Sequence, residues 1–456
     1  MTNNQSMRFK AAISLSTIAV LLCLAGTSVA QEPARIALET YSLPNGLKVI
    51  LAPDHSAQVV AVDVWYNVGS RNEAKGRTGF AHLFEHMMFQ GSENVAKAEH
   101  FKKVEQAGGS VNGSTAEDRT NYFQVLPSNR LNLGLWLEAD RMRSLAVTDS
   151  NFANQREAVK EERRLRVDNQ PYAAAIFEGM YALADSGTCF PYAHSVIGSM
   201  EDLGAAQTPD VKAFFNLYYA PNNATLTVTG DFQPDEAKRL IQRYFGGIPR
   251  GQEPPPVTCA PAFNAGQIRR PWPDSKANLP GVLLAYRIPE YRSEDTPAIE
   301  LLATILGQGE SSRINRAVVR EQKLAQFAIV LSNPASPRRG PGVLLALGIS
   351  NQGVGPDSLE AGLIAEFRRI ATEGATTAEL AKAQNGFRTQ LITQQQQALA
   401  RAEALQAANL FLGNPEAVNT NWRRYLAVTT EDLKRVAEKY FRPENSLVLL
   451  ITPGAQ

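Results

Sequence analysis

His82, Glu85 and His86 are the residues of this chain whose types and spacing point most directly to chemistry. On a helix, two histidines four residues apart project from one face, about one turn apart. Two neutral imidazoles at this spacing suit a zinc ion, and Glu85 lies where it can take a proton from water at the metal. The alternative is a buried helix with two hydrogen-bonded histidines, but the chain holds only five histidines in 456 residues. The pattern therefore predicts a zinc site with Glu85 as the base.

A catalytic zinc ion usually takes three protein ligands. The best source of a third is the segment 154–164, which is rich in helix-forming residues. Glu162 shares a helical face with Gln155 and Val159, at spacings i, i+4 and i+7, whereas Glu161 is rotated away. The alternative is an ordinary solvated helix. Spacing by itself does not decide whether Glu161 or Glu162 is the third ligand.

The elements that must position these residues alternate between strands and helices. Alternation of β-branched and polar residues marks the strands, and longer apolar periodicity marks the helices. A polar loop, 69–76, leads into the histidine helix. We expect strands at 47–51 and 59–68, a strand beginning at 108–113 and resuming at 120–125, and helices at 80–89, 97–106 and 131–145.

The second half of the chain repeats the first. Thr208–Gly230 has a helix–turn–strand pattern that returns 222 residues later in Thr430–Thr452, and Val64–Val68 parallels Leu284–Ile288 at an offset of 220. In that register the metal-site positions of the second half are apolar: Leu302, Ile305 and Leu306. The fold class is therefore mixed α/β, with two homologous domains from an internal duplication, each a sheet with helices packed on it.

The chain is too long for one ordinary core, which agrees with two domains. A proline-rich stretch begins at Gly251 and is typical of an extended linker. We expect an N-terminal metal-binding peptidase domain at 31–250, a linker at 251–273, and a homologous C-terminal domain without metal ligands at 274–456.

Residues 1–30 have the pattern of a secretory signal peptide. Arg8 and Lys10 precede an apolar run that ends near Gly26, and small residues lead to a cleavage site after Ala30. A membrane anchor would need a run of about 20 residues, and a lipoprotein at Cys23 would need small residues before it. We expect export, to the periplasm, and no later segment is long and apolar enough to span a membrane.

Net charge limits the kinds of partner that we expect, and the cysteine count limits the number of possible disulfides. The net charge of +1, with 20% charged residues, does not indicate binding to nucleic acid or to a membrane surface. After signal cleavage only Cys189 and Cys259 remain. An oxidising compartment would allow a disulfide, but the sequence does not show that they meet.

His82-Leu-Phe-Glu-His86, followed by Glu162 in an Arg-x-Ala-Val-x-x-Glu context, resembles the pitrilysin family of inverted zinc metallopeptidases. That family includes the mitochondrial processing peptidase. Further matches lie at 108–112, 168–172 and 191–198, and the resemblance spans nearly all of the mature chain. It implies two halves enclosing a chamber, one Zn²⁺ per chain on His82, His86 and Glu162, and Glu85 as base.

The resemblance also implies a substrate and an assembly. The expected reaction is hydrolysis of peptides or small unfolded proteins by a zinc-dependent endopeptidase. The strand around Val111, Asn112 and Gly113 could pair with an extended peptide, although an ordinary edge strand explains it equally well. Short members of the family work as dimers of two-half subunits.

Two departures from the family pattern matter. Gln155 stands where relatives often carry a second glutamate, and it can hydrogen-bond a ligand but brings no charge. Complete enzymes also carry an Arg and a Tyr seven residues apart, where this chain has Val319 and Gln326. Arg320 is one residue out of register, and Phe327 has no hydroxyl. We therefore expect a heterodimer with a paralogue that supplies Arg and Tyr, with a homodimer as the alternative.

Two other function classes compete with the peptidase. The chain could be a non-catalytic assembly subunit, or a module that encloses peptides without cutting them. The intact metal set argues against the assembly subunit, since a retired site has no need of Glu85. A module that only encloses peptides would survive the change Glu85→Gln unaltered. The remaining histidines, His55, His100 and His194, are expected to be ordinary surface or loop residues.

Overall fold

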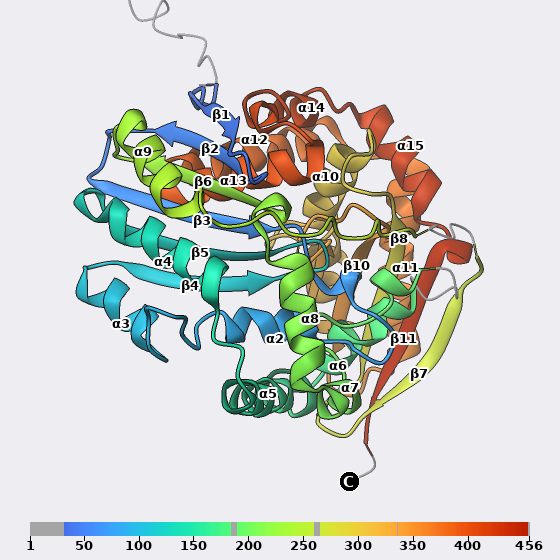
Figure 1. Ribbon diagram of the computed structural model, residues 1–456. Coiled ribbons are helices and arrows are strands. Elements are labelled where there is room, and N and C mark those ends of the chain that lie inside the picture. The colour runs from blue at the N-terminus through green and yellow to red at the C-terminus, as the bar shows by residue number, and fades with distance from the viewer. Residues whose placement is uncertain (1–31, 184–188, 260–264, 335, 455–456) are drawn as a thin grey trace, which may run out of the picture. The chain divides into compact units, whose positions relative to one another are not determined.

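The computed structural model describes residues 32–183, 189–259, 265–334 and 336–454 (Figure 1). The expected signal peptide, residues 1–30, lies outside the described residues and stays a prediction. Contacts separate the segment up to Ala34 from one compact unit, Arg35–Gln456. Among the described helices, none has both the length and the apolar character that a membrane crossing requires.

The first half of that unit builds a six-stranded sheet in the order β1-β2-β6-β3-β5-β4. β2 and β6 run parallel, and the other neighbouring strands are antiparallel. Helices pack on one face and bury the first core. The strands are β1 (Glu39–Ser42), β2 (Lys48–Pro53), β3 (Val59–Tyr66), β4 (Ser110–Thr115), β5 (Thr120–Pro127) and β6 (Ala224–Gly230), and the helices are α2 (Phe80–Met87), α3 (Glu99–Gln106), α4 (Leu131–Ser144), α5 (Asp149–Arg163), α7 (Met200–Ala205), α8 (Thr208–Tyr218) and α9 (Pro234–Phe245).

The second half builds a five-stranded sheet in the order β7-β11-β8-β10-β9, again with one parallel pair, β7 and β11. Helices on one face bury a second core. The strands are β7 (Ile268–Asp274), β8 (Gly281–Ile288), β9 (Ala325–Ser332), β10 (Gly342–Ser350) and β11 (Ser446–Pro453), and the helices are α10 (Thr296–Gly307), α11 (Pro356–Glu373), α12 (Thr377–Gln395), α14 (Trp422–Leu426) and α15 (Thr430–Tyr440).

The two sheets share strand order, strand direction and register, which confirms the prediction of two homologous α/β domains. Leu226 lies between Val49 and Val64 in the first sheet. Val448 lies in the same way between Arg269 and Leu284 in the second. Helix α10 takes the place of α2, and its residues at the three metal-site positions are buried apolar side chains: Leu302, Ile305 and Leu306.

The halves exchange helices, which the sequence did not lead us to expect. Helix α13 (Ala398–Ala407), from the second half, packs on β3 and β6, where the Gln406 amide donates to the carbonyls of Asp63 (3.2 Å) and Thr225 (2.8 Å). Helix α6 (Ala173–Phe177) and the turn after it, from the first half, pack on the second sheet. Figure 1 shows both crossings, and together they join the halves into one unit.

The predicted linker, 251–273, is wrong at its carboxyl end. Ile268–Asp274 forms β7, which pairs in parallel with β11. The side chains of Ile268 and Trp272 pack against the core under the second sheet. The prolines at 271 and 273 are tolerated because β7 is an edge strand, where a missing N–H costs no ladder hydrogen bond.

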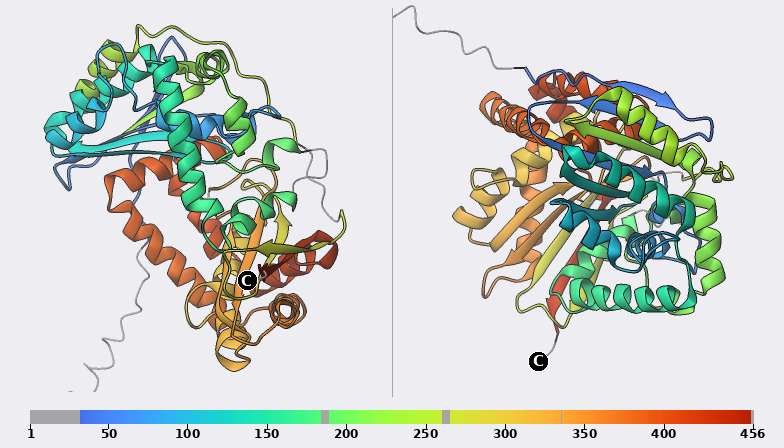
Figure 2. Two further views of the ribbon diagram at one scale, coloured as in Figure 1. Left: turned by 90° about the horizontal axis from the view of Figure 1, so that it is seen from below. Right: turned by 60° about the vertical axis from the view of Figure 1, so that its left-hand side comes forward.

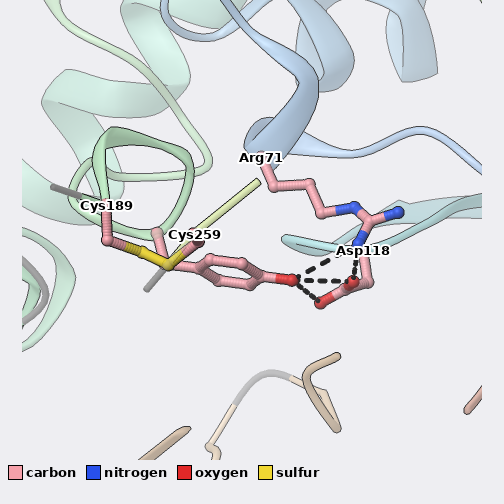
Figure 3. Close-up of a disulfide and its surroundings, with 5 residues drawn as sticks. Arg71, Asp118, Cys189 and Cys259 are labelled. Carbon is pink, nitrogen blue, oxygen red and sulfur yellow. Dashed lines mark hydrogen bonds and ion pairs between the residues drawn. A yellow bond between two sulfur atoms is a disulfide. The ribbon is translucent and has the colours of Figure 1, made fainter. Parts of the chain in front are cut away.

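Cys189 and Cys259 form a disulfide, which the sequence left open (Figure 3). Their Cα atoms lie 4.7 Å apart, and the bond closes a segment 70 residues long. In Figure 3 an aromatic ring lies between the disulfide and the ion pair of Arg71 and Asp118, whose charged groups are 2.8 Å apart. The disulfide thus ties Cys259, in the predicted linker, to the first half.

Reducing this disulfide should lower the free energy of unfolding by about 2–4 kcal/mol, because an open chain of this length gains entropy when it unfolds. Urea titrations with and without a thiol reductant measure the change. The double variant Cys189→Ser/Cys259→Ser should have the same free energy of unfolding as the reduced protein, and the reductant should not change it. Equal unfolding midpoints for oxidised and reduced protein would contradict the expectation.

Candidate metal centre

Helix α2 is held by its core face and by a buried carboxylate at its amino end. Leu83, Phe84 and Met87 are buried in the first core. Both oxygens of Glu73 accept backbone N–H groups of the first turn, from Gly79 and Ala81, each at 2.8 Å. A carboxylate at this position complements the positive end of the helix. The polar loop predicted before α2 therefore supplies its cap.

The side chains of His82, His86 and Glu162 converge. Glu162 Oε2 lies 3.0 Å from His86 Nε2 and 3.6 Å from His82 Nε2, and one ligand atom from each residue lies within 4.8 Å of the others. Ligand atoms at the usual ~2.0–2.1 Å from a tetrahedral zinc ion lie about 3.3 Å apart. Two imidazole nitrogens and a carboxylate oxygen at these separations fit zinc.

The pKa values of His82 and Glu162 also suit a metal. Burial, with the neighbouring His86, lowers the pKa of His82 to about 4, so this imidazole is neutral near pH 7 and keeps a free lone pair. The hydrogen bond with His86 lowers the pKa of Glu162, which is therefore ionised. The second oxygen of Glu162 pairs with Arg166 at 2.9 Å.

The structure shows which of the two neighbouring glutamates, Glu161 or Glu162, faces the histidines. The Glu161 side chain is 56% exposed and pairs with Arg164 (2.9 Å), whereas that of Glu162 is 17% exposed and faces the histidines. Gln155 is buried on α5, but its amide donates to the neighbouring Asn154 (2.8 Å). No hydrogen bond joins Gln155 to the three converging residues in the described part of the chain, so its supporting role stays a prediction.

Glu85 is oriented by a residue that sequence reasoning missed. The Thr115 hydroxyl donates to Glu85 Oε2 at 2.7 Å. Burial raises the pKa of Glu85, while Thr115 and His86 lower it in part. A Cβ added at Gly113 would lie 3.2 Å from Glu85 Cγ, so the backbone of β4 passes close to the Glu85 side chain. Thr115 lies two residues beyond the 108–113 motif, in the same strand.

Strand β4 is the last strand of its sheet and pairs with β5 along one edge. The two form a hairpin, a correction to the single strand expected to resume at residue 120. Asn112 and Gly113 line the cavity at the metal centre, but Val111 packs against the first core. Two of the three predicted substrate-binding residues thus lie where a peptide could reach them.

The cavity at the metal centre has a volume of about 670 Å³. Its lining includes His82, Glu85, His86, Glu162 and Arg166, and most of the remaining lining residues outside β4 are apolar. Leu331 and Pro334, from the second half, also line the cavity. They belong to no sequence motif, and the packing of the two halves brings them there. The apolar lining residues are Val167, Ile176, Phe177, Met180, Val196, Ile197, Leu331 and Pro334.

The turn of the β4–β5 hairpin is fixed by the second half. Glu117 and Asp118, both fully buried, pair with Arg338 and Arg339 respectively, from the loop between β9 and β10. Breaking such buried pairs is strongly unfavourable. The second half thereby holds the strand that carries Thr115 in place beside Glu85.

The other histidines lie apart from this centre. His55 is exposed and pairs with Asp231, and His194 lies in a loop near Glu73, as expected. His100 corrects the expectation of a surface residue: it is 3% exposed on α3 and its ring packs against Phe89.

Comparison with known proteins places the chain in a family. Residues 48–186 match the model "Insulinase (Peptidase family M16)", and residues 206–387 match "Peptidase M16 inactive domain". The zinc protease PqqE of Helicobacter pylori is 30% identical over 446 residues, which cover 96% of this chain and 98% of that protein. The mitochondrial-processing peptidase subunit beta of Blastocladiella emersonii is 23% identical over 418 residues, 90% of this chain and 88% of that one.

A solved structure shares the whole fold. The crystal structure of a protease from Helicobacter pylori superposes with a TM-score of 0.86 at 28% identity, covering 92% of this chain and all of that one. Its match extends over both sheets rather than over the metal centre alone. With a relative aligned along almost its full length and both halves matched by family models, the chain belongs to peptidase family M16.

Proposed function

We propose that this protein is a zinc-dependent endopeptidase that hydrolyses peptides or small unfolded proteins. One observation carries the proposal: His82, His86 and Glu162 converge beside Glu85 in a cavity that residues of the edge strand β4 help to line. In this reading the inverted His-x-x-Glu-His segment supplies two ligands and Glu162 the third. The name zinc protease, carried by the relative from Helicobacter pylori, supports it.

A bound zinc ion would act as a Lewis acid that acidifies water and polarises the scissile carbonyl. Glu85 takes the proton of the attacking water and passes it to the leaving amine. Thr115 donates a hydrogen bond to one oxygen of Glu85 and so restrains the carboxylate, which lines the cavity. The backbone at Asn112 and Gly113 pairs with the extended peptide, which binds the main chain with little regard to its sequence.

We also propose that the protein is exported to the periplasm and works as the metal-bearing subunit of a heterodimer. The Cys189–Cys259 disulfide supports export, because disulfides persist mainly in oxidising compartments. The similarity to a processing-peptidase chain that is named as a subunit supports assembly with a related partner.

Replacing Glu162 with glutamine should weaken zinc binding by more than about 100-fold, because a neutral amide replaces a ligand and losing even an outer-shell partner costs 10- to 100-fold. Glu161→Gln, on the same helix but exposed, is the matched control and should keep one zinc per chain. Competition with a zinc chelator measures both affinities, and cleavage of an unfolded peptide should fall with the zinc content. A reversed order would move the ligand to Glu161. A wild-type chain without zinc would favour an assembly or peptide-binding subunit.

A further inference from the structure

The two faces of strand β4 have different neighbours. Thr115 donates to Glu85 from one face, so Ser114, the residue before it, points to the opposite face. On that face Ser114 lies directly across from Asn121 on β5, and Asn121 lies directly across from Trp65 on β3. Side chains directly across from each other share a face, so these three form a row from the edge strand to an inner strand of the first sheet.

Arg119, in the turn between β4 and β5, reaches along this row. Its Nη1 donates to the Ser114 carbonyl oxygen (2.8 Å), to the Ser114 hydroxyl and to Asn121 Oδ1 (3.0 Å). Its guanidinium lies over the Trp65 ring, 5.0 Å from the centroid, an arrangement in which a cation and an aromatic face attract. Because β4 pairs with a neighbouring strand along one edge only, Arg119 gives it an attachment that the sheet itself does not.

Helix α13 of the second half and the π-helical turn after it (Ala408–Leu412) pack on the same face. Thr225 on β6 lies directly across from Trp65, and its hydroxyl accepts a hydrogen bond from Asn409 Nδ2 (3.2 Å). The Trp65 ring also meets the ring of Phe411 edge to face, with centroids 6.5 Å apart. Contacts therefore lead from the second half, through the row around Trp65, to the edge strand at the metal centre.

Two carboxylates lie near Arg119. Asp63, which is fully buried, accepts hydrogen bonds from Trp65 Nε1 (2.9 Å) and Asn121 Nδ2 (3.4 Å). The other carboxylate is that of Glu403 on α13. Burial lowers the pKa of Arg119, whereas Asp63 and Glu403 raise it. Removing the positive charge would leave these carboxylates without it, so a test of the hydrogen bonds must keep the charge.

We propose that Arg119 is a positioning residue for peptide binding: by tying Ser114 to Asn121 it holds β4 where its free edge pairs with an extended peptide. This role rests on the proposed peptidase function, which supplies the peptide as ligand. Arg119 does not line the metal-centre cavity, so it acts through β4 and not on the peptide itself. A role in stability alone would lower the melting temperature and leave the affinity of the folded chain for peptides unchanged.

Peptide binding without hydrolysis tests this role, in the zinc-loaded chain that carries Glu85→Gln. The added change Arg119→Lys keeps the positive charge but replaces the planar guanidinium with a shorter ammonium group. It should weaken the binding of a fluorescent extended peptide about tenfold, the scale of one hydrogen bond to a charged group, with the zinc content unchanged. Arg130→Lys, at an exposed position before α4, is the matched control and should leave the affinity unchanged.

Ser114→Ala is a second variant, which removes one acceptor of Arg119 and leaves every charge in place. It should weaken peptide binding about threefold, the scale of one hydrogen bond between neutral groups. Should Arg119→Lys prevent folding, this variant still tests the role.

A series of peptides, each methylated at one backbone nitrogen, shows whether either effect runs through strand pairing. At the nitrogen that pairs with β4, methylation should remove the dependence on Arg119 and on Ser114. A direct contact of Ser114 with the peptide would persist in every methylated peptide and would overturn the proposal. So would an unchanged affinity in the folded Arg119→Lys variant.

The same measurements separate this role from the peptidase function. If peptide binding depends on Arg119 but the chain with Glu85 intact never cleaves, the peptidase function alone is refuted. If the chain cleaves peptides but binds them equally well with Arg119→Lys, the positioning role alone is refuted.

Discussion

Replacing Glu85 with glutamine should leave the zinc content unchanged and slow peptide cleavage by about 100- to 10,000-fold, the usual contribution of a general base. Glutamine keeps the size of the side chain and can still accept the hydrogen bond from Thr115, which is 2.7 Å from the carboxylate. It cannot take a proton from water. Zinc is retained because the three converging ligand atoms come from His82, His86 and Glu162.

The measurement pairs elemental analysis with mass-spectrometric cleavage rates on one preparation. Glu161→Gln changes charge on the exposed side of α5 and should match the wild type in both. If Glu85→Gln kept substantial activity, another group would have to move the proton, and the mechanism would be wrong. A loss of zinc would instead mean that Glu85 is a ligand.

Mixing the purified chain with a paralogue that carries the missing Arg and Tyr should raise its cleavage rate by about 100- to 1,000-fold. A peptidase must stabilise the charge that develops on the carbonyl oxygen, and losing one donor for it costs about that much. In this chain the second half contributes Leu331 and Pro334 to the metal-centre cavity, and neither side chain is a donor.

The two positions at which the family resemblance calls for Arg and Tyr carry neither residue in this chain. Val319 packs partly buried against the second core, and Gln326 is exposed on β9. Arg320 pairs with Glu310 at 2.5 Å, and Phe327 is 47% exposed without a hydroxyl. A homodimer would repeat the same deficit in both copies.

Light scattering should show a 1:1 complex of the two chains, and activity should saturate at that ratio. Substituting Ala for the Arg of the paralogue should cancel the stimulation without dissolving the complex. Glu85→Gln in this chain should cancel it as well, since the base lies here. Full activity of the isolated chain would refute the heterodimer, and Arg320 or Arg166 would then be the first donors to examine.

Features that depend only on residues close together in the sequence could be predicted without a structure. His82 and His86 share a face because any α-helix brings residues four apart together. The strand at 59–68 and the repeated helix–turn–strand units follow from local alternation and turn chemistry, and the two sheets match in register. The apolar residues of α10 likewise mark the half that lacks the ligands.

Contacts between residues far apart in the sequence could be identified only from the tertiary structure. Neighbouring glutamates, 161 and 162, differ by about 100° around a helix, and only the docking of α5 on α2 decides which one meets the histidines. Thr115 meets Glu85 across 30 residues, Glu117 meets Arg338 across 221, and the two cysteines meet across 70. No local periodicity encodes such contacts, because their partners lie on different elements. The sequence by itself thus determined the spacing of the first two candidate ligands and the doubled scaffold. The convergence of the third candidate ligand, the hydrogen bond to Glu85 and the joining of the halves were decided by packing.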